Sequence, residues 1–315
     1  MNPTLIASSS PQVTSTAVTT APAGLRSALV PALFAVALFA ATAPLTQLAL
    51  TQLSPMLVSA ARALLAGIGA LICIRLNRWP LPPKPLWLPL LLTGVMVGFG
   101  FPWLLAISLQ SHSAAETGLW LAGLPLLTSI LAVVVFGERV QKRFWFWASL
   151  SFGLLLWVIA PADPLSDNAA VPAMIGTLVC GGVGYTLGAW LSRSLGGWQT
   201  ICWALVVILP FSALSTGIAI GQQPAPADGY QWSVLLSVVY LALISQWWGF
   251  RFWYGALSRG TARMAQVQIL QPLFTLILVA MLPDSLLPGS ATTPGLWLLA
   301  VLTMLTVAMT LRTRQ

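Results

Sequence analysis

Four charged side chains lie inside stretches of the sequence that are otherwise apolar: Arg62, Glu116, Arg251 and Arg263. A charge inside a hydrocarbon layer costs about 2.5–3.5 kcal/mol on insertion scales, so each of the four is a candidate functional residue. Glu116 is the one acid among them, and membrane proteins use such acids to carry protons. Arg251 and Arg263 lie near the ends of their stretches, where a long basic side chain reaches the polar head groups.

Residues that carry out catalysis or bind metals are scarce. The chain has one histidine, His112, and only Asp163 and Asp167 among its six acids lie within four positions of each other. Its three cysteines lie in apolar runs without metal-ligand spacing: Cys73, Cys180 and Cys202. An enzyme acting on lipids or isoprenoids would need clustered acids, a nucleophile–base pair or a metal site. The sequence therefore predicts no catalytic residue, no metal and no cofactor.

Uncharged polar residues in the middle of the apolar stretches indicate a binding cavity. Gln268, Gln271 and Thr275 fall within about 60° of one another on a helical wheel of 100° per residue. Glycine and proline interrupt another stretch at residues 98–103, as they do at binding sites in membrane helices, although small residues also permit close packing. We expect six side chains to contact a bound small molecule: Gln271, Gln268, Tyr185, Trp103, Trp120 and Gln47.

The elements that hold these residues are membrane spans. Of 315 residues, 58% are hydrophobic and only 6% are charged, against about 25% charged residues in soluble domains. A helix needs about 20 mostly apolar residues to cross a bilayer. Ten stretches meet this condition: 28–49, 55–75, 86–109, 113–136, 144–161, 173–192, 197–219, 231–255, 261–282 and 294–311. The sequence thus predicts an all-α integral membrane protein with ten transmembrane helices.

Charge is segregated between the two sets of loops that ten spans would create. One set carries basic residues: Arg26, Arg75, Arg78, Lys84, Arg139, Lys142, Arg143, Arg193, Arg259, Arg312 and Arg314. The other set carries acids and no Lys or Arg: Asp163, Asp167, Asp228 and Asp284. The positive-inside rule then places both termini in the cytoplasm and the spans in the plasma (inner) membrane. The net charge of +8 is therefore a signal of topology, and nucleic acid is not expected as a partner.

On this topology Arg62 and Glu116 both lie toward the outer face. An ion pair between them would neutralise both charges and form an outer gate. Two alternatives stay open: Glu116 reaches interfacial water, and Arg62 donates hydrogen bonds to backbone carbonyl groups of a neighbouring helix. Glu138, by contrast, follows the fourth span on the cytoplasmic side, where solvation or pairing with a nearby arginine is expected.

An internal repeat relates the two halves of the chain. Residues 125–131 and 272–278 are identical at five of seven positions, and each segment lies in the fourth span of a five-span half. Because five is odd, the second copy runs through the membrane in the opposite sense, as in many secondary transporters. The sequence predicts that the chain consists of five parts: a disordered tail at 1–27, a first repeat at 28–161, an external linker at 162–172, a second repeat at 173–311 and a cytoplasmic tail at 312–315.

Three segments resemble a known family. Ser54-Pro55 followed by residues 62–66 (Arg-Ala-Leu-Leu-Ala) is similar to the second-span signature of the EamA type within the drug/metabolite transporter superfamily. Residues 125–139 resemble the end of that family's fourth span, and residues 253–262 resemble its junction between the eighth and ninth spans. The second half departs from the pattern, because it ends its ninth span with Leu-Pro-Asp and has no counterpart of Arg62.

The resemblance implies a ten-helix exporter of small metabolites such as amino acids or drug-like compounds. We expect a non-enzymatic secondary transporter that works by alternating access, with a small molecule and membrane lipid as its partners. An integral-membrane lipid-modifying enzyme and a non-transporting sensor or scaffold remain the alternatives. The substrate, the direction, the coupling ion, a homodimer and cleavage of the first span as a signal peptide are left open.

Overall fold

The computed structural model describes residues 23–159 and 169–281, together with scattered residues between 294 and 309. Within this part of the chain the regular structure is helical and contains no strand. Seven of the described helical stretches are long and apolar enough to cross a membrane, and one bent pair of helices would add an eighth. The all-α, multi-pass membrane class predicted from the sequence is therefore confirmed.

The first four predicted spans appear as four helical stretches, some of them assembled from shorter pieces. In chain order the pieces are α1 (Ala23–Ala40), α2 (Thr42–Ala49), α3 (Pro55–Leu76), η1 (Lys84–Leu86), α4 (Trp87–Thr93), η2 (Gly94–Gly100), α5 (Phe101–Ser108), α6 (Ala114–Trp120), η3 (Leu121–Gly123) and α7 (Leu124–Phe136). A further helix, α8 (Lys142–Ile159), occupies the place of the predicted fifth span.

The second half contains the predicted sixth to ninth spans. Their pieces are α9 (Ala170–Leu195), α10 (Gly197–Val207), α11 (Leu209–Gln222), α12 (Trp232–Val239), η4 (Tyr240–Gly249), α13 (Phe250–Leu257), α14 (Thr261–Ala265), η5 (Gln266–Leu270) and α15 (Gln271–Met281). Helices α10 and α11 meet at a bend of 51°, next to Pro210, which has no N–H for a helical hydrogen bond. Most of the predicted tenth span, most of the 162–172 linker, most of the N-terminal tail and all of the C-terminal tail lie outside the described residues.

Local sequence explains where several spans begin and end. Ser54 caps α3 by accepting the N–H of Leu57, and Pro55 occupies the first turn, where its missing N–H costs nothing. Ser113 and Glu116 form a reciprocal capping box at the start of α6. Gly137 ends α7 in the left-handed region, with φ of 64°, which glycine adopts without strain.

Two kinds of irregular turn interrupt the middle of the spans. The third span changes to wide π turns over η2, and the span at Trp232–Leu257 does the same over η4. The spans at Ala114–Phe136 and Thr261–Met281 instead tighten to 3₁₀ turns, η3 and η5, just before Pro125 and Pro272. Such interruptions free backbone groups and occur often at functional sites.

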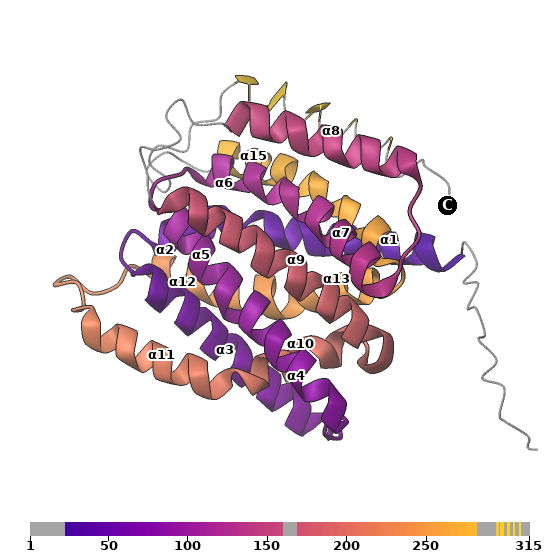
Figure 1. The fold of residues 1–315 in the computed structure, drawn as a ribbon. Helices are drawn as coiled ribbons and strands as arrows, with labels where there is room; N and C mark the ends of the chain where they lie inside the picture. Colours follow the sequence, from indigo (N-terminus) through magenta and orange to yellow (C-terminus); the bar gives the residue numbers. More distant parts are fainter. Residues whose placement is uncertain are drawn as a thin grey trace, which may run out of the picture.

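The spans pack closely through small residues (Figure 1). Helix α9 runs through the bundle beside α4, α5, α7 and α10, while α8 lies along one face and α11 along the opposite edge. A Cβ atom on Gly94 would lie 2.3 Å from the carbonyl oxygen of Ala204, and one on Gly188 would lie 2.2 Å from the ring of Tyr254. Glycine therefore sets the distance between these helices, as in other membrane bundles.

The bundle has two ends, defined here by their contacts. At the glutamine end, Gln223 donates to the carbonyl of Gln52 at 2.6 Å and accepts the N–H of Ser54 at 2.7 Å. At the ion-pair end, Arg193 and Glu138 form a salt bridge of 2.7 Å. The bent pair α10–α11 begins just after Arg193 and finishes just before Gln223, so the two ends lie at opposite ends of this pair.

Candidate functional site

A chain of buried amide and hydroxyl groups lies between the spans. Gln268 in η5 donates from Nε2 to the hydroxyl oxygen of Tyr185 on α9 and to Oε1 of Gln271, each at 3.1 Å. Gln271 and Thr275 donate to the last two carbonyl groups of α1, at 3.3 Å and 2.9 Å. All four side chains are buried. The face formed by Gln268, Gln271 and Thr275 is therefore directed at α1 and α9.

Arg62 is the charged member of this region. It lies on α3, is only 2% exposed, and donates from Nε to Oε1 of Gln246 in η4. Gln246 donates in turn to the carbonyl of Gly98 in η2 at 2.9 Å. Gln246 also lies four positions before Phe250, whose ring packs against Tyr185, and this brings Arg62 to the same region as the amide chain. We call Arg62, Tyr185, Gln246, Gln268 and Gln271 the polar centre.

Aromatic rings pack against one side of the polar centre. The ring centroid of Tyr185 lies 5.7 Å from that of Phe250 and 5.6 Å from that of Trp253. Phe39 lies 5.1 Å and 6.1 Å from the same two rings. The interplanar angles run from 53° to 81°, so the rings meet tilted or edge-on, the arrangement that aromatic pairs prefer. The polar centre thus adjoins a rigid apolar wall.

Several polar atoms in and beside this region have no hydrogen-bond partner among the described residues. They include Oε1 of Gln268 and Nε1 of Trp253. The Tyr185 hydroxyl accepts from Gln268 but donates to no described residue. Buried polar groups are normally paired, so such unmatched atoms call for an explanation. The described residues contain no group of three or more His, Cys, Asp or Glu side chains placed to hold a metal.

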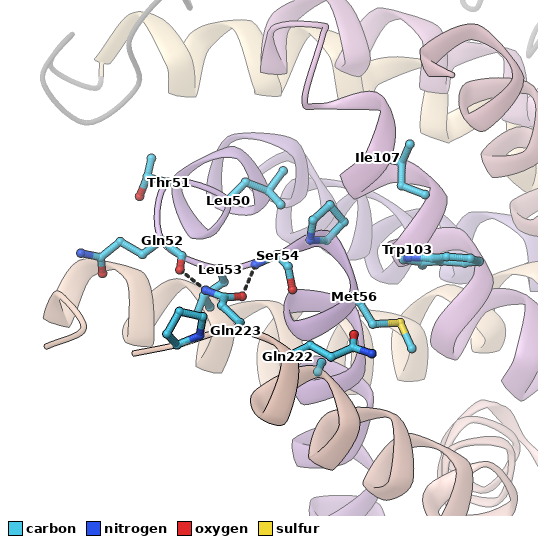
Figure 2. Close-up of a pocket in the computed structure, with 13 residues that line it drawn as sticks. Leu50, Thr51, Gln52, Leu53, Ser54, Met56, Trp103, Ile107, Gln222 and Gln223 are labelled. Carbon is cyan, nitrogen blue, oxygen red and sulfur yellow. Dashed lines mark hydrogen bonds between the residues drawn. The ribbon is translucent and has the colours of Figure 1, made fainter. Parts of the chain in front are cut away.

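A separate pocket of about 670 Å³ lies at the glutamine end. Figure 2 shows its walls, which come from the α2–α3 loop, from α5 through Trp103 and Ile107, and from the end of α11 through Gln222 and Gln223. The hydrogen bonds of Gln223 to Gln52 and Ser54 tie two of these walls together.

Three of the six residues expected to contact a bound molecule come together in the structure: Gln268, Gln271 and Tyr185. Trp103 does not join them, because it lines the pocket at the glutamine end and is 37% exposed. The glycine- and proline-containing interruption that pointed to Trp103 is present, as the wide turns of η2 just before it, and these turns alter the rotation of α5.

The other two expected contacts take different places. Trp120 is buried in α6, and its indole nitrogen has no hydrogen-bond partner among the described residues. Gln47 accepts the N–H of Ala114, the first residue of α6, at 3.0 Å. This bond satisfies one of the N–H groups that a helix start leaves open, so Gln47 fixes the start of the fourth span.

The ion pair between Arg62 and Glu116 that the sequence suggested is not formed. Glu116 is exposed and accepts the N–H of Ser113 within its own capping box. Arg62 instead binds Gln246, which lies 184 positions away in sequence. A carboxylate in the first turn of a helix is stabilised by the helix dipole and by the free N–H groups there, and this local interaction holds Glu116.

A second cluster closes the ion-pair end. Glu138 binds Arg193 at 2.7 Å and accepts the N–H groups of Thr261 at 3.3 Å and Ala262 at 3.0 Å. Arg193 also donates to the hydroxyl of Thr261 at 3.3 Å. We call these four residues the Glu138 clamp. The sequence had pointed to an arginine nearby in the chain, whereas the structure supplies one from α9 and adds the start of α14.

The two remaining charges inside spans lie toward the same end. The guanidinium carbon of Arg251 lies 4.7 Å from the ring centroid of Trp198 and 5.4 Å from that of Trp248, as cation–π pairs do. Arg263 lies one position after Ala262 in α14.

Sequence reasoning missed two glutamines that the structure makes central. Gln246 joins Arg62 to Gly98, and Gln266 donates to the hydroxyl of Ser129 on α7 at 3.0 Å. Both are fully buried amides inside predicted spans. Considering every glutamine inside a predicted span, and not only those near a proline, would have included both residues.

These observations define a class: a multi-pass membrane protein whose spans are interrupted around a buried polar centre, which is how secondary transporters are built. Residues 26–160 match the EamA-like transporter family. The chain is also 34% identical over 252 residues to a Bacillus subtilis (strain 168) protein described as "Uncharacterized transporter YdeK", covering 78% of this chain and 85% of that protein. The chain belongs to the EamA-like transporter family of the drug/metabolite transporter superfamily.

A solved crystal structure shares the fold. It aligns with 90% of this chain and 96% of its own, with a TM-score of 0.65 and 20% sequence identity. At that sequence identity the similarity shows a shared arrangement of helices and does not indicate a shared function.

Proposed function

We propose that the chain exports a small metabolite, such as an amino acid or a drug-like compound, by alternating access. In this proposal ten spans form two inverted halves, 28–161 and 173–311, joined by an external linker at 162–172. The protein lies in the plasma (inner) membrane with both termini in the cytoplasm, as the charge segregation favours.

The inverted halves are supported by matching interruptions. The third span of each proposed half contains π turns, at Gly94–Gly100 and Tyr240–Gly249. The fourth span of each contains 3₁₀ turns, at Leu121–Gly123 and Gln266–Leu270, and each of these precedes a helix with proline at its second position. The match to the family also covers a single half.

The observation that carries the proposal is that the polar bonds near the polar centre cross between the two halves. Arg62 binds Gln246, and Gln246 binds the carbonyl of Gly98. Gln271 binds a carbonyl of α1, and the hydroxyl groups of Thr42 and Ser245 are 2.9 Å apart. One half can therefore rock against the other only by exchanging these bonds, and a polar substrate offers replacements.

One end of the bundle is closed by polar contacts and the other holds a pocket, which supports an outward-facing state of the transport cycle. The Glu138 clamp joins α7, α9 and α14 at the ion-pair end. The pocket lined by Trp103 lies at the opposite end. On the proposed topology the structure is closed toward the cytoplasm, and the pocket faces outward. We assign Trp103 to the route between the pocket and the polar centre.

Transport by purified protein tests the proposal. Liposomes that contain the full-length protein are loaded with labelled amino acids, amines or drug-like cations. Efflux of the labelled compound is then followed under imposed pH or sodium gradients. Glu116→Gln is included to test whether this exposed acid takes part in proton coupling. Efflux of at least one class above protein-free liposomes is expected, and no movement of any class under any gradient would refute the proposal.

A matched pair of variants links transport to the polar centre. Gln271→Leu removes a buried cross-half bond, while Gln222→Leu changes an exposed glutamine at the rim of the pocket. Losing a bond of about 1–1.5 kcal/mol should slow efflux about tenfold in the first variant, with little change in the second. Equal rates in both variants would contradict a role for the polar centre.

A further inference from the structure

Arg62 has a positive charge, and no acid among the described residues lies against it. Its side chain is 2% exposed, and its single hydrogen bond to a described residue runs from Nε to the neutral amide of Gln246. No described residue accepts a hydrogen bond from either terminal nitrogen. A guanidinium group stays protonated in proteins, so this charge cannot be removed by burial.

The described acids are all committed elsewhere. Glu116 is exposed in its capping box, Glu138 belongs to the clamp at the ion-pair end, and Asp228 is exposed in the loop between α11 and α12. Buried charges are normally paired, and an unpaired one is costly. The second half offers no charge related by symmetry, because Gly197–Gln222 contains no Lys, Arg, Asp or Glu.

The groups around Arg62 complete a binding site for an anion. Gln246, the partner of Arg62, lies four positions before Phe250, whose ring centroid is 5.7 Å from that of Tyr185, and the Tyr185 hydroxyl has a hydrogen to donate. Gln268 donates from Nε2 to Tyr185, and its amide oxygen, Oε1, is buried and accepts no hydrogen bond from a described residue. The rings of Phe250 and Trp253 pack against Tyr185. The site therefore offers a forked cation, a hydroxyl donor, an amide acceptor and an apolar wall.

We infer that Arg62 is the anion-binding residue of the transport site and that the transported molecule carries a carboxylate. The planar guanidinium matches a carboxylate through two parallel hydrogen bonds. The carboxylate takes the terminal nitrogens of Arg62 and the hydrogen of Tyr185, an N–H group of the ligand meets Oε1 of Gln268, and an apolar group contacts the aromatic wall. This inference rests on the proposed transport function, which it makes more specific.

Matched compounds test the inference directly. Full-length protein in lipid nanodiscs is titrated with phenylalanine, with phenethylamine, which lacks the carboxylate, and with 3-phenylpropionate, which lacks the amine. Leucine, 3-methylbutylamine and 4-methylpentanoate form a second set of a different apolar shape. Stabilisation against heat reports binding without requiring transport. In at least one set the amino acid should bind best, the acid next, and the amine should give no shift.

Variants assign the effect to Arg62. Arg62→Met should weaken carboxylate binding at least about tenfold, because a charge-assisted pair is lost, and Arg62→Lys should lie between it and the unmodified protein. Arg251→Met removes another arginine of a span and should leave binding unchanged. If Arg62→Met fails to fold, the inference is still tested by the carboxylate affinity of Arg62→Lys and by the order in which the matched compounds bind the unmodified protein.

The possible outcomes separate the two proposals. Equal binding of amine and carboxylate, undiminished carboxylate binding by Arg62→Met, or no stabilisation by any carboxylate in either set refutes the anion site. If liposomes then still transport an amine or a neutral compound, the transport function stands. If carboxylates bind through Arg62 but nothing crosses the liposome membrane, the anion site stands and the transport function falls.

Discussion

Replacing Glu138 by glutamine is expected to release the ion-pair end of the bundle. The carboxylate accepts hydrogen bonds from Arg193 at 2.7 Å, from the N–H of Thr261 at 3.3 Å and from the N–H of Ala262 at 3.0 Å. Oε1 takes the first two and Oε2 the third, whereas a glutamine amide has only one accepting oxygen. Glu138→Gln therefore loses the ion pair and at least one acceptor at the start of α14.

The size of the effect follows from these contacts. The side chains of Arg193 and Glu138 are 41% and 20% exposed, so solvent weakens the ion pair to about 0.5–1 kcal/mol. The charge at a helix start adds about 0.3–1 kcal/mol, and the lost acceptor about 0.5–1.5 kcal/mol. Together these make about 1.3–3.5 kcal/mol, which shifts the ratio of open to closed molecules about tenfold to about three-hundredfold.

Thiol labelling measures that ratio. Ser129 is buried on α7 and donates to the carbonyl of Ala262 at 3.1 Å, so a cysteine there is shielded while the clamp is closed. Ser129→Cys is placed in a background whose native cysteines are replaced by alanine, and inside-out vesicles are treated with a membrane-impermeant maleimide. The labelling rate should rise by the calculated factor in Glu138→Gln.

The control for this experiment is Arg139→Gln. Arg139 is exposed and makes none of the contacts of its neighbour, and its replacement also changes the charge by one unit, in the opposite direction. It should leave the labelling rate unchanged. The reasoning is refuted if both variants label alike, or if Glu138→Gln lowers the melting temperature without exposing the cysteine at position 129.

Three further predictions concern helix packing, the start of the fourth span and the loop that lines the pocket. Gly94→Ala should destabilise by about 1–3 kcal/mol, because the new Cβ would lie 2.3 Å from the carbonyl oxygen of Ala204; Gly217→Ala, which meets nothing within 4 Å, should be neutral or stabilising in the same thermal melt. Ser113→Ala should cost about 0.5–2 kcal/mol through the lost cap of α6, and a melt unchanged within error would contradict this. Gln223→Leu should speed hydrogen exchange of the 50–54 loop through loss of two bonds, and equal protection in both proteins would show that the loop is held by other contacts.

Much of the fold could be predicted because a membrane span has a long and simple sequence signal. The predicted span 55–75 is observed as Pro55–Leu76, and 113–136 as Ala114–Phe136. Even the interruption expected at residues 98–103 overlaps the π turns of η2. Length and apolarity set these boundaries, and both can be read directly from the chain.

The contacts between spans were harder to predict. The relation of Gln268 to Gln271 was found because both lie on one helix, where spacing fixes the face. The partner of Arg62, by contrast, depends on how α3 and η4 are rotated about their axes. Spans that are apolar on nearly every side carry little periodicity to fix that rotation, and irregular turns such as η2 alter it further. The position of Trp103 relative to the polar centre depends on the same rotation.

Because of where the charges lie in the bundle, ionic strength should affect the contacts at the ion-pair end and leave those of the polar centre unchanged. At 0.15 M salt, ions screen exposed charges over about 8 Å but act weakly on buried groups. The Glu138–Arg193 pair is partly exposed, whereas the bonds of the polar centre are sealed and have uncharged acceptors. Concentrated salt should thus loosen the ion-pair end alone and bias the resting conformation, while the affinity of the interior is preserved.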